Sequence, residues 1–320
     1  MPSFFVCISN CQAYNRDTQA SYHIPHHPAD PTDDLIGLYA QLPADQQRRL
    51  RQLAVFPATF DPAAAAATWE LEEAPTSDSL GELLLGGWLS RDAATNRYRL
   101  TEPARALALA ELSPLEQSTA EERHAAHYLS VLAAANAWYV QGGEAVARGL
   151  ALFDLEASNI LAGEAWASTH AGQDDHAARL ACDYAGSEMF HKRQPPRERI
   201  ARLEVALAAA RKLLDREAES RILFSLGRAC LDLGEPQRAL EYIEQALQIA
   251  RERGDRRGEG VALARLGLAH GQLGQPRRAL ELLDQAVPIL REVGHRRGEG
   301  AALNNLVLVH RSDTHGQAAA

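Results

Sequence analysis

The C-terminal part of the chain repeats itself with a fixed period. The segment RGDRRGEG at Arg253–Gly260 returns as VGHRRGEG at Val293–Gly300, and LGEPQRALE returns as LGQPRRALE. Leu226 recurs as Leu266 and again as Leu306, each copy 40 residues after the last. A fixed period of about 20–50 residues is typical of stacked-repeat architectures and not of compact enzyme domains.

Each period predicts two antiparallel helices. Apolar residues in Glu235–Arg253 recur every three or four positions, which places one stripe along a helix. Pro236 stands in the first turn, where its missing N–H costs nothing, and Gly254 follows as a helix stop. The partner segment, 257–273, carries its own stripe. One such hairpin cannot bury its stripe alone, so we expect neighbouring copies to stack.

Two departures from simple helix packing are visible in the repeats. Gly227 and Gly267 recur on the first helix of each pair, where we expect the helices to approach closely. Pro288 replaces Gln248 inside the second helix and predicts a local kink there.

These residues resemble tetratricopeptide repeats, in a longer variety of 40 residues, over Pro196–Leu306. The resemblance is carried by the Leu-Gly pair of the first helix, and by the alanine and the leading proline of the second. Cys230 and His270 stand where the family commonly has tyrosine. The resemblance implies a mainly α fold, an α-α superhelical solenoid that binds protein or peptide ligands.

Residues 33–112 form a different unit, which predicts helices followed by a two-stranded wing. Asp61 is a good N-cap for the third helix. The expected helices are Asp34–Leu42, Ala44–Ala54, Ala63–Leu71, Thr76–Leu85 and Glu102–Leu112, with a hairpin of Trp88–Arg91 and Arg97–Thr101 around Ala93–Asn96. This order predicts a small winged-helix domain with one β-hairpin.

The segments LRQLAVFPATFDPAAAAA, GWLSRD and RYRLTEPARALALAEL carry a second resemblance. They are similar to the winged helix of bacterial STAND signalling ATPases with an NB-ARC core, which often precedes tetratricopeptide repeats. In that family a His-Asp pair after the hairpin reaches the nucleotide phosphate, whereas this chain has Thr101-Glu102. No G-x-x-x-x-G-K-[ST] phosphate loop occurs. The resemblance therefore implies the sensor part of such a protein, without cofactor.

The remaining segments complete the expected organisation. Residues 113–195 predict a helical linker with amphipathic stretches at Glu121–Val140, Gly149–Thr169 and Ala177–Lys192. We expect a disordered leader at 1–32, repeats over 196–312 and a disordered tail at 313–320. The last hairpin has a first helix and no second, and solenoids normally need a capping helix. This predicts either that the chain is a piece of a longer protein or that it covers this end by self-association through the C-terminal repeat.

Composition narrows the class of partner and compartment. The formal net charge is −9, with 33 basic and 42 acidic side chains, which argues against a general nucleic-acid binder. Only Lys192 and Lys212 are lysines. Four cysteines form no dense framework, and no apolar run reaches the roughly 18 residues of a membrane span. We expect a cytoplasmic protein that does not enter membranes.

No arrangement of residues predicts catalysis or a metal site. There is no H-E-x-x-H, no nucleophile elbow and no C-x-x-C. His124 and His127 lie on one predicted helix face, but no third ligand is evident, so solvated or core histidines are the preferred interpretation. The leader's Cys7, Cys11, His23, His26 and His27 match no trusted metal-ligand spacing.

DNA binding through the wing is the main alternative, and it would make the protein a transcriptional regulator with a repeat sensor. The wing offers Arg91, Arg97 and Arg99. The candidate recognition helix, Thr76–Leu85, carries Asp78 and Glu82 and no base. Residues 33–112 hold 7 basic and 12 acidic side chains, a poor electrostatic match for DNA.

The preferred hypothesis is a non-catalytic protein-interaction module. The first helix of each repeat normally lines the inner face of a solenoid. The residues expected on that face are Arg221, Phe224, Arg228, Arg265, Asn304 and Arg311. Arginines beside an aromatic ring suit an acidic or extended ligand.

Overall fold

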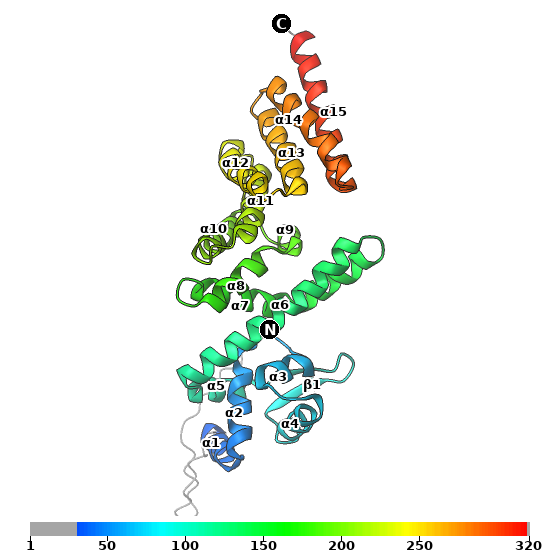
Figure 1. Cartoon of the computed structure of the whole chain (residues 1–320). Coiled ribbons are helices and arrows are strands. Elements are labelled where there is room, and N and C mark those ends of the chain that lie inside the picture. Colours follow the sequence, from blue (N-terminus) through cyan, green and yellow to red (C-terminus); the bar gives the residue numbers. More distant parts are fainter. Residues whose placement is uncertain (1–30, 319–320) are drawn as a thin grey trace, which may run out of the picture. The chain divides into compact units, whose positions relative to one another are not determined.

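The computed structural model describes residues 31–318, and their side chains except at 31–34, 190–192 and 312–318 (Figure 1). The predicted leader lies outside the described residues up to position 30. Contacts divide the chain at Gln41. Helix α1 (Pro31–Gln41) belongs to the first unit, and everything from Leu42 onward belongs to the second.

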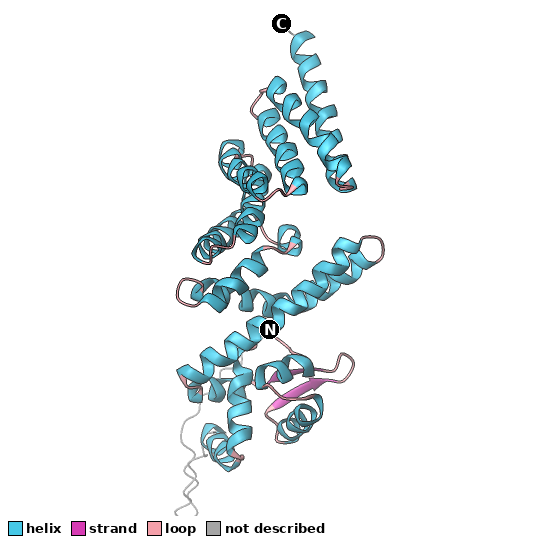
Figure 2. Ribbon diagram, in the orientation of Figure 1, coloured by secondary structure: helices cyan, strands magenta, loops and turns pink. Residues whose placement is uncertain are grey.

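The fold is mainly α, as expected from the sequence, with one two-stranded antiparallel sheet among the described residues (Figure 2). The first part of the second unit contains α2 (Ala44–Gln52), η1 (Leu53–Val55), α3 (Pro62–Trp69), α4 (Glu73–Leu85), β1 (Leu89–Asp92), β2 (Arg97–Leu100) and α5 (Glu102–Glu111).

Local capping explains the start of α3. The Asp61 carboxylate accepts a hydrogen bond from the Ala64 N–H at 2.8 Å, and Pro62 occupies the first turn. Helix α4 begins at Glu73, three residues before the expected Thr76. The Thr76 hydroxyl donates to the Glu72 carbonyl one turn back, so it does not cap the helix.

The β-hairpin lies where the sequence predicts it. Leu89 pairs with Leu100 and Asp92 with Arg97, around the turn Ala93–Asn96. Asn96 takes up a positive φ of 53°, which asparagine tolerates better than most residues. The Phe60 and Tyr98 backbones exchange two hydrogen bonds at 2.8 and 3.0 Å, which attach the hairpin to the segment before α3.

A buried ion pair connects this hairpin to the helices that follow. The Arg97 guanidinium donates to both carboxylate oxygens of Glu156 at 2.5 and 2.8 Å, and it also donates to the Thr59 carbonyl. Both side chains are less than 10% exposed. Asn159 donates to Glu156 at 3.2 Å, so the carboxylate accepts from two partners. Charges this deeply buried are tolerated only when they are paired and hydrogen-bonded.

The predicted linker contains α6 (Pro114–Gln141), α7 (Ala145–His170), α8 (Asp175–Ala185) and α9 (Glu188–Arg193). The single helix expected over Ala177–Lys192 is wrong, because the chain breaks between α8 and α9 at Gly186 and Ser187. The Glu188 N–H donates to the Asn136 side chain of α6 at 3.0 Å, and this contact anchors the start of α9.

The repeats form α10 (Pro196–Lys212), α11 (Arg216–Asp232), α12 (Pro236–Glu252), α13 (Arg256–Gln272), α14 (Pro276–Glu292) and α15 (Arg296–Ala318). Each helix packs on the next one along the chain, and α13 also contacts both α11 and α15. This is the helix-hairpin solenoid predicted by the 40-residue period.

Equivalent positions have equivalent environments in the first two copies. Leu226 is fully buried and Leu266 is 4% exposed, whereas Leu306 on α15 is half-buried. Gly254 and Gly294 take φ values of 67°, and Leu214 adopts the same left-handed conformation one period earlier. The turn geometry is therefore a property of the repeat, and glycine makes it less strained.

Glycine lets the two helices of a pair approach closely. A Cβ added to Gly227 would lie 2.3 Å from Ile243 Cγ1, and one added to Gly267 would lie 2.6 Å from Leu283 Cγ. The corresponding residue of α15 is Val307, which is 56% exposed. Helix α15 therefore has a valine where α11 and α13 have the glycine that contacts the second helix of the pair.

One sequence-based expectation about the helices, the tail from residue 313, differs from the structure, and the kink at Pro288 stays a prediction. Helix α14 continues through Pro288, whose side chain is exposed. Since Pro288 points away from the core, the lost backbone hydrogen bond does not interrupt the buried stripe. Helix α15 continues to Ala318, so the tail expected from residue 313 is helical over 313–318.

We expect Gly227→Ala to lower stability, because its Cβ would meet Ile243 and overpacking costs about 1–3 kcal/mol. Gly300→Ala is the matched control. Its added Cβ meets nothing within 4 Å, so helix propensity should raise stability by up to about 1 kcal/mol. Urea unfolding followed by circular dichroism compares the two variants. Equal stabilisation by both would contradict the close approach of α11 and α12.

We expect Arg97→Ala to cost about 3–5 kcal/mol, because it leaves the buried Glu156 carboxylate without its cation. Arg99→Ala, two residues along the same strand and exposed, should change the free energy of unfolding by less than about 0.5 kcal/mol. Thermal unfolding measures both. Similar losses for the two variants would show that the Arg97–Glu156 pair is not what stabilises this region.

Candidate ligand-binding groove of the repeats

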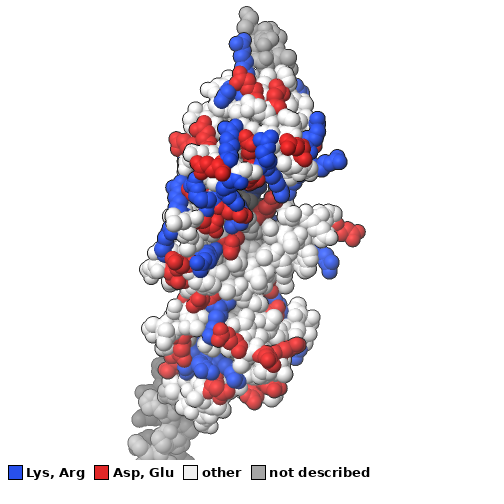
Figure 3. Space-filling model, viewed as in Figure 1, with Lys and Arg blue, Asp and Glu red and all other residues white. Residues whose placement is uncertain are grey.

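A cavity of about 620 Å³ opens on the inner helices of the repeats. Its walls come mainly from α11 and α13, with Gly186 and Glu188 at the start of α9 and His295 just before α15. Figure 3 shows positive and negative side chains interspersed over the repeats. The cavity joins segments that lie more than 100 residues apart in the sequence, from Gly186 to His295.

Four of the six residues predicted for a partner-binding groove line this cavity. Arg221, Phe224 and Arg228 project from α11, and Arg265 projects from α13. Asn304 and Arg311 do not line it; both are exposed on α15. The structure therefore brings together the residues of two successive inner helices and leaves out those of the third.

Two of these arginines have no counter-ion. Among the described side chains, no carboxylate lies within 4 Å of the Arg228 or Arg265 guanidinium, and the Arg265 Nε atom is buried without a hydrogen-bond partner. Burial, together with the nearby Arg228 charge, lowers the pKa of Arg265 to about 10. Burial and the charge of Arg199 lower the pKa of Arg228 as well. The pair concentrates positive charge where water is scarce.

Two other arginines of the cavity are neutralised. Arg221 faces Asp183 at 3.5 Å, and Arg253 pairs with Glu217 at 2.7 Å. Glu188, on the cavity wall, pairs with Arg297 at 3.3 Å. The uncompensated charge therefore lies on Arg228, Arg265 and Arg257, which also lines the cavity and has no described carboxylate within 4 Å.

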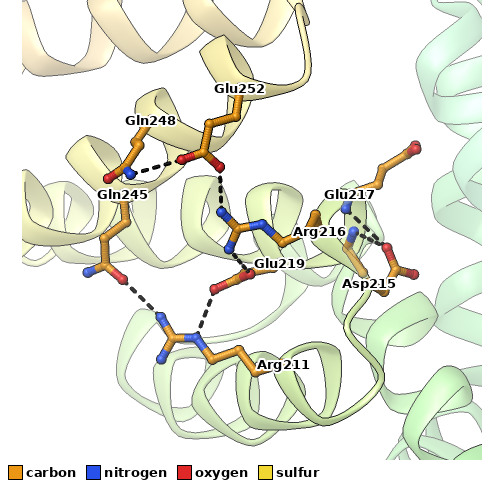
Figure 4. A network of polar contacts seen from close by, with 9 residues as sticks. Arg211, Asp215, Arg216, Glu217, Glu219, Gln245, Gln248 and Glu252 are labelled. Atoms are coloured by element: carbon orange, nitrogen blue, oxygen red, sulfur yellow. Dashed lines mark hydrogen bonds and ion pairs between the residues drawn. The ribbon is translucent and has the colours of Figure 1, made fainter.

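Away from the cavity, the repeats carry an ion-pair ladder that the sequence analysis missed. Glu219 lies between Arg211 at 2.9 Å and Arg216 at 2.7 Å, and Arg216 continues to Glu252 (Figure 4). Forty residues on, Glu259 contacts Arg251 and Arg256. Glu299 contacts Arg291 at 2.7 Å in the third copy. The sequence did contain a signal for this ladder, because the arginines and the glutamates that form it both recur every 40 residues.

The sequence analysis also missed His295 and Arg257 as cavity residues. Asp215 and Asp255 cap α11 and α13 through hydrogen bonds to backbone N–H groups, and His295 replaces them in the third copy. The Nδ1 atom of His295 is buried without a hydrogen-bond partner. Burial, Arg257 and Arg297 lower its pKa. A break in the repeat at positions 215, 255 and 295 was the signal that could have identified it.

The wing differs from the surface expected for DNA contacts. Arg97 was predicted to be a contact residue, but it is buried against Glu156 and cannot reach a ligand on this face. Arg91 is exposed, bonds Asn96 at 2.9 Å and lies over the Tyr98 ring, and Arg99 is exposed. The Thr101 hydroxyl donates to the Trp88 carbonyl at 3.3 Å, so it serves the hairpin itself.

Of the two histidines of α6, His124 lies in the core and His127 is half-buried beside it. His124 is 3% exposed and packs against Phe56 and Tyr128, and the half-buried His127 contacts the other side of Tyr128. Burial lowers the pKa of His124 to about 4 and also lowers that of His127. Within residues 31–318, no group of three or more His, Cys, Asp or Glu side chains is placed to hold a metal ion.

Family comparisons agree with the repeat geometry. Models of the tetratricopeptide repeat match residues 220–253 and 239–292. The chain contains tetratricopeptide repeats. Such repeats are scaffolds for protein–protein interaction, and this fold is typically non-catalytic. No match was found among curated protein sequences.

Solved structures with similar folds have low identity to this chain. One is a Signal Transduction ATPase with Numerous Domains (STAND) protein with a tetratricopeptide repeat sensor from Pyrococcus horikoshii, at 15% identity and a TM-score of 0.38. The match covers 88% of this chain but only 56% of that one. Another is a protein described as a kinesin light chain with TPR-like repeats from Podospora anserina, at 19% identity and a TM-score of 0.42, covering 61% of this chain and 91% of that one.

Over the part of the chain that the structure describes, the helices lack the combination of length and apolar character that crossing a bilayer requires.

We expect acid to destabilise the protein through His124. Its pKa is about 4 in the folded state and about 6.5 when unfolded, so the unfolded chain binds the proton more tightly. The stabilisation that neutral His124 contributes is therefore present above pH 6.5. About 2 kcal/mol of it is lost between pH 6.5 and pH 5. Urea unfolding at both pH values should show this loss reduced in His124→Phe. His310→Gln, at an exposed position, is the control and should retain it.

Proposed function

We propose that this chain is a non-catalytic interaction module whose repeats bind a protein or peptide partner through the groove on α11 and α13. The observation that supports this most strongly is the pair Arg228 and Arg265, which line the cavity without a counter-ion. A folded protein gains little from two adjacent unpaired cations, because burial and mutual repulsion both oppose them. An acidic partner group would supply the missing charge.

The contrast between repeated and unrepeated residues supports the same assignment. The arginines of the ladder recur with the period and are paired, which fits a role in holding neighbouring repeats together. Arg228 and Arg265 do not recur: Leu268 and Leu308 follow Arg228, and Ser225 and Asn305 occupy the copies of Arg265. Residues that the scaffold does not need in every copy are the better candidates for ligand contact.

The wider role we propose is that of a sensor in a STAND-type signalling protein. It rests on the sequence resemblance of the hairpin region and on the repeats that follow it. The chain has no phosphate-loop sequence, and Thr101-Glu102 stands where the nucleotide-sensing pair would be, so this chain would receive the signal and would not hydrolyse a nucleotide. In the same proposal, residues 33–112 are a winged helix, 113–195 a linker and 196–312 the sensor repeats, in the cytoplasm.

Self-association belongs to this proposal as a second contact. Leu303, Val307 and Leu308 of α15 are between 41% and 56% exposed. An apolar stripe of this kind is normally covered by a following helix in a solenoid.

DNA binding is not favoured, because Arg97 is buried and α4 carries Glu73, Asp78 and Glu82 without a base.

The test is partner capture by the full chain from a lysate of the source organism, quantified by mass spectrometry. We expect Arg228→Glu with Arg265→Glu to lose at least about tenfold of the specifically captured protein, because two charge-assisted contacts are reversed. The matched control, Arg277→Glu with Arg197→Glu, makes the same charge change at two exposed positions outside the cavity and the ion-pair ladder, and it should capture normally. Unchanged recovery with the groove variant would overturn the assignment.

A further inference from the structure

The cavity on α11 and α13 carries a charge imbalance of defined size. Five arginines and three carboxylates line it, which leaves two positive charges when His295 is neutral. The ion pairs already described account for Arg221 and Arg253, and none of the described carboxylates lies within 4 Å of Arg228, Arg257 or Arg265. The excess therefore lies on one wall of the cavity and not across the whole surface.

The unpaired groups line one cavity and come from neighbouring elements. Arg228 and Arg265 come from neighbouring inner helices and line the same cavity, and the Arg228 charge is close enough to lower the pKa of Arg265. The buried Arg265 Nε and the buried His295 Nδ1 both lack a hydrogen-bond partner among the described residues. The His295 Nδ1 atom faces the start of α15, since a Cβ added to Gly298 would lie 2.4 Å from it. The Arg265 Nε–H can only donate, and buried polar atoms are nearly always satisfied in proteins, so this atom points to a missing acceptor.

The repeat is interrupted at positions 228, 265 and 295, and position 257 changes from acid to base after the first copy, with Arg297 keeping the base in the third. In the preceding copy, Ser225 stands for Arg265 and Glu217 for Arg257; in the following copy, Leu268 stands for Arg228. Asp255 is the earlier equivalent of His295, so the third copy exchanges an acid for a base. All four departures add positive charge or remove negative charge at the same cavity. The scaffold alone does not require this coincidence.

We propose that this cavity is a binding site for a phosphoryl group, held between Arg228, Arg265 and Arg257. This deepens the proposed function by naming the chemistry that the groove recognises, and it rests on that function for the identity of the bearer. A phosphoryl group carries about −1.5 to −2 charges at pH 7 and three acceptor oxygens. It would neutralise the excess and satisfy the unpaired guanidinium donors.

A single carboxylate fits less well. It carries one negative charge and two oxygens, so it would leave one positive charge uncompensated and fewer donors satisfied. Guanidinium groups bind phosphate through paired N–H donors, which is why clusters of arginine are common at phosphate sites. Phe224 lines the same cavity and offers an apolar surface to whatever carries the phosphoryl group.

The site is tested with two probes that share a ring and differ in the anion, phenyl phosphate and benzoate, titrated into the full chain by calorimetry at constant ionic strength. We expect saturable binding of phenyl phosphate at one site, and binding of benzoate at least about tenfold weaker. Equal or tighter binding of benzoate would overturn the phosphoryl assignment in favour of a carboxylate. Absence of saturable binding of phenyl phosphate would overturn it as well.

Variants locate the site. We expect Arg265→Gln and Arg228→Gln each to weaken phenyl phosphate binding by at least about tenfold, because each loses charge-assisted hydrogen bonds. Arg277→Gln removes the same charge from exposed α14 and should bind as the unmodified chain does. Circular dichroism checks folding, and the half-buried Arg228 provides a second variant if Arg265→Gln unfolds. Full affinity in both folded variants would place the phosphoryl group elsewhere and refute the site.

The source of the phosphoryl group is decided by treating the captured partner with phosphatase. Loss of capture would show that the partner carries the phosphate. Capture that resists phosphatase but is displaced by phenyl phosphate would assign the site to a small phosphorylated molecule. If phenyl phosphate does not bind while capture still depends on Arg228 and Arg265, the phosphoryl inference fails and the protein-binding function stands.

Discussion

Close packing between helices of the same hairpin is the contact on which the repeats depend. Gly227 and Gly267 leave space for Ile243 and Leu283, so the two helices approach until the side chain of one fills the gap in the other. Without this contact, each amphipathic stripe would remain half exposed. The ion-pair ladder of Glu219, Glu259 and Glu299 lies away from the groove and links the end of one helix to the start of the next. The arginines that join neighbouring repeats are thus distinct from Arg228 and Arg265, which line the cavity.

Because the ladder arginines are paired and the cavity arginines are not, the cavity carries unpaired positive charge. Arginines paired with glutamate in every copy are unavailable to a ligand, since removing either partner would leave a charge uncompensated. Arg228 and Arg265 lie where the repeat has apolar or neutral residues in its other copies, and no glutamate accompanies them. A regular scaffold can carry such an irregular patch, because each repeat contacts mainly its neighbours and one altered position does not propagate.

The hairpin region shows a different use of buried charge. Arg97, Glu156 and Asn159 join a strand to a helix about 60 residues away through hydrogen bonds that are almost fully withdrawn from water. Arg97 and Arg99 are two positions apart on β2 and therefore lie on the same face of the strand. The alternation of the sequence could not tell which of the two is buried. Only the position of Thr59 and α7 over one end of the strand decides that Arg97 is buried and Arg99 exposed.

The sequence by itself determined the period, the helix pairs, their glycine turns, the hairpin and four of the six groove residues. All of these follow from local spacing along one helix or strand, which the order of residues encodes directly. Only the tertiary structure decided that Asn304 and Arg311 lie outside the cavity, that His295 and Arg257 belong to it, and which arginines are left unpaired. Pairing is a property of neighbours in space, and charges acquire partners from helices that the spacing of a single segment cannot place.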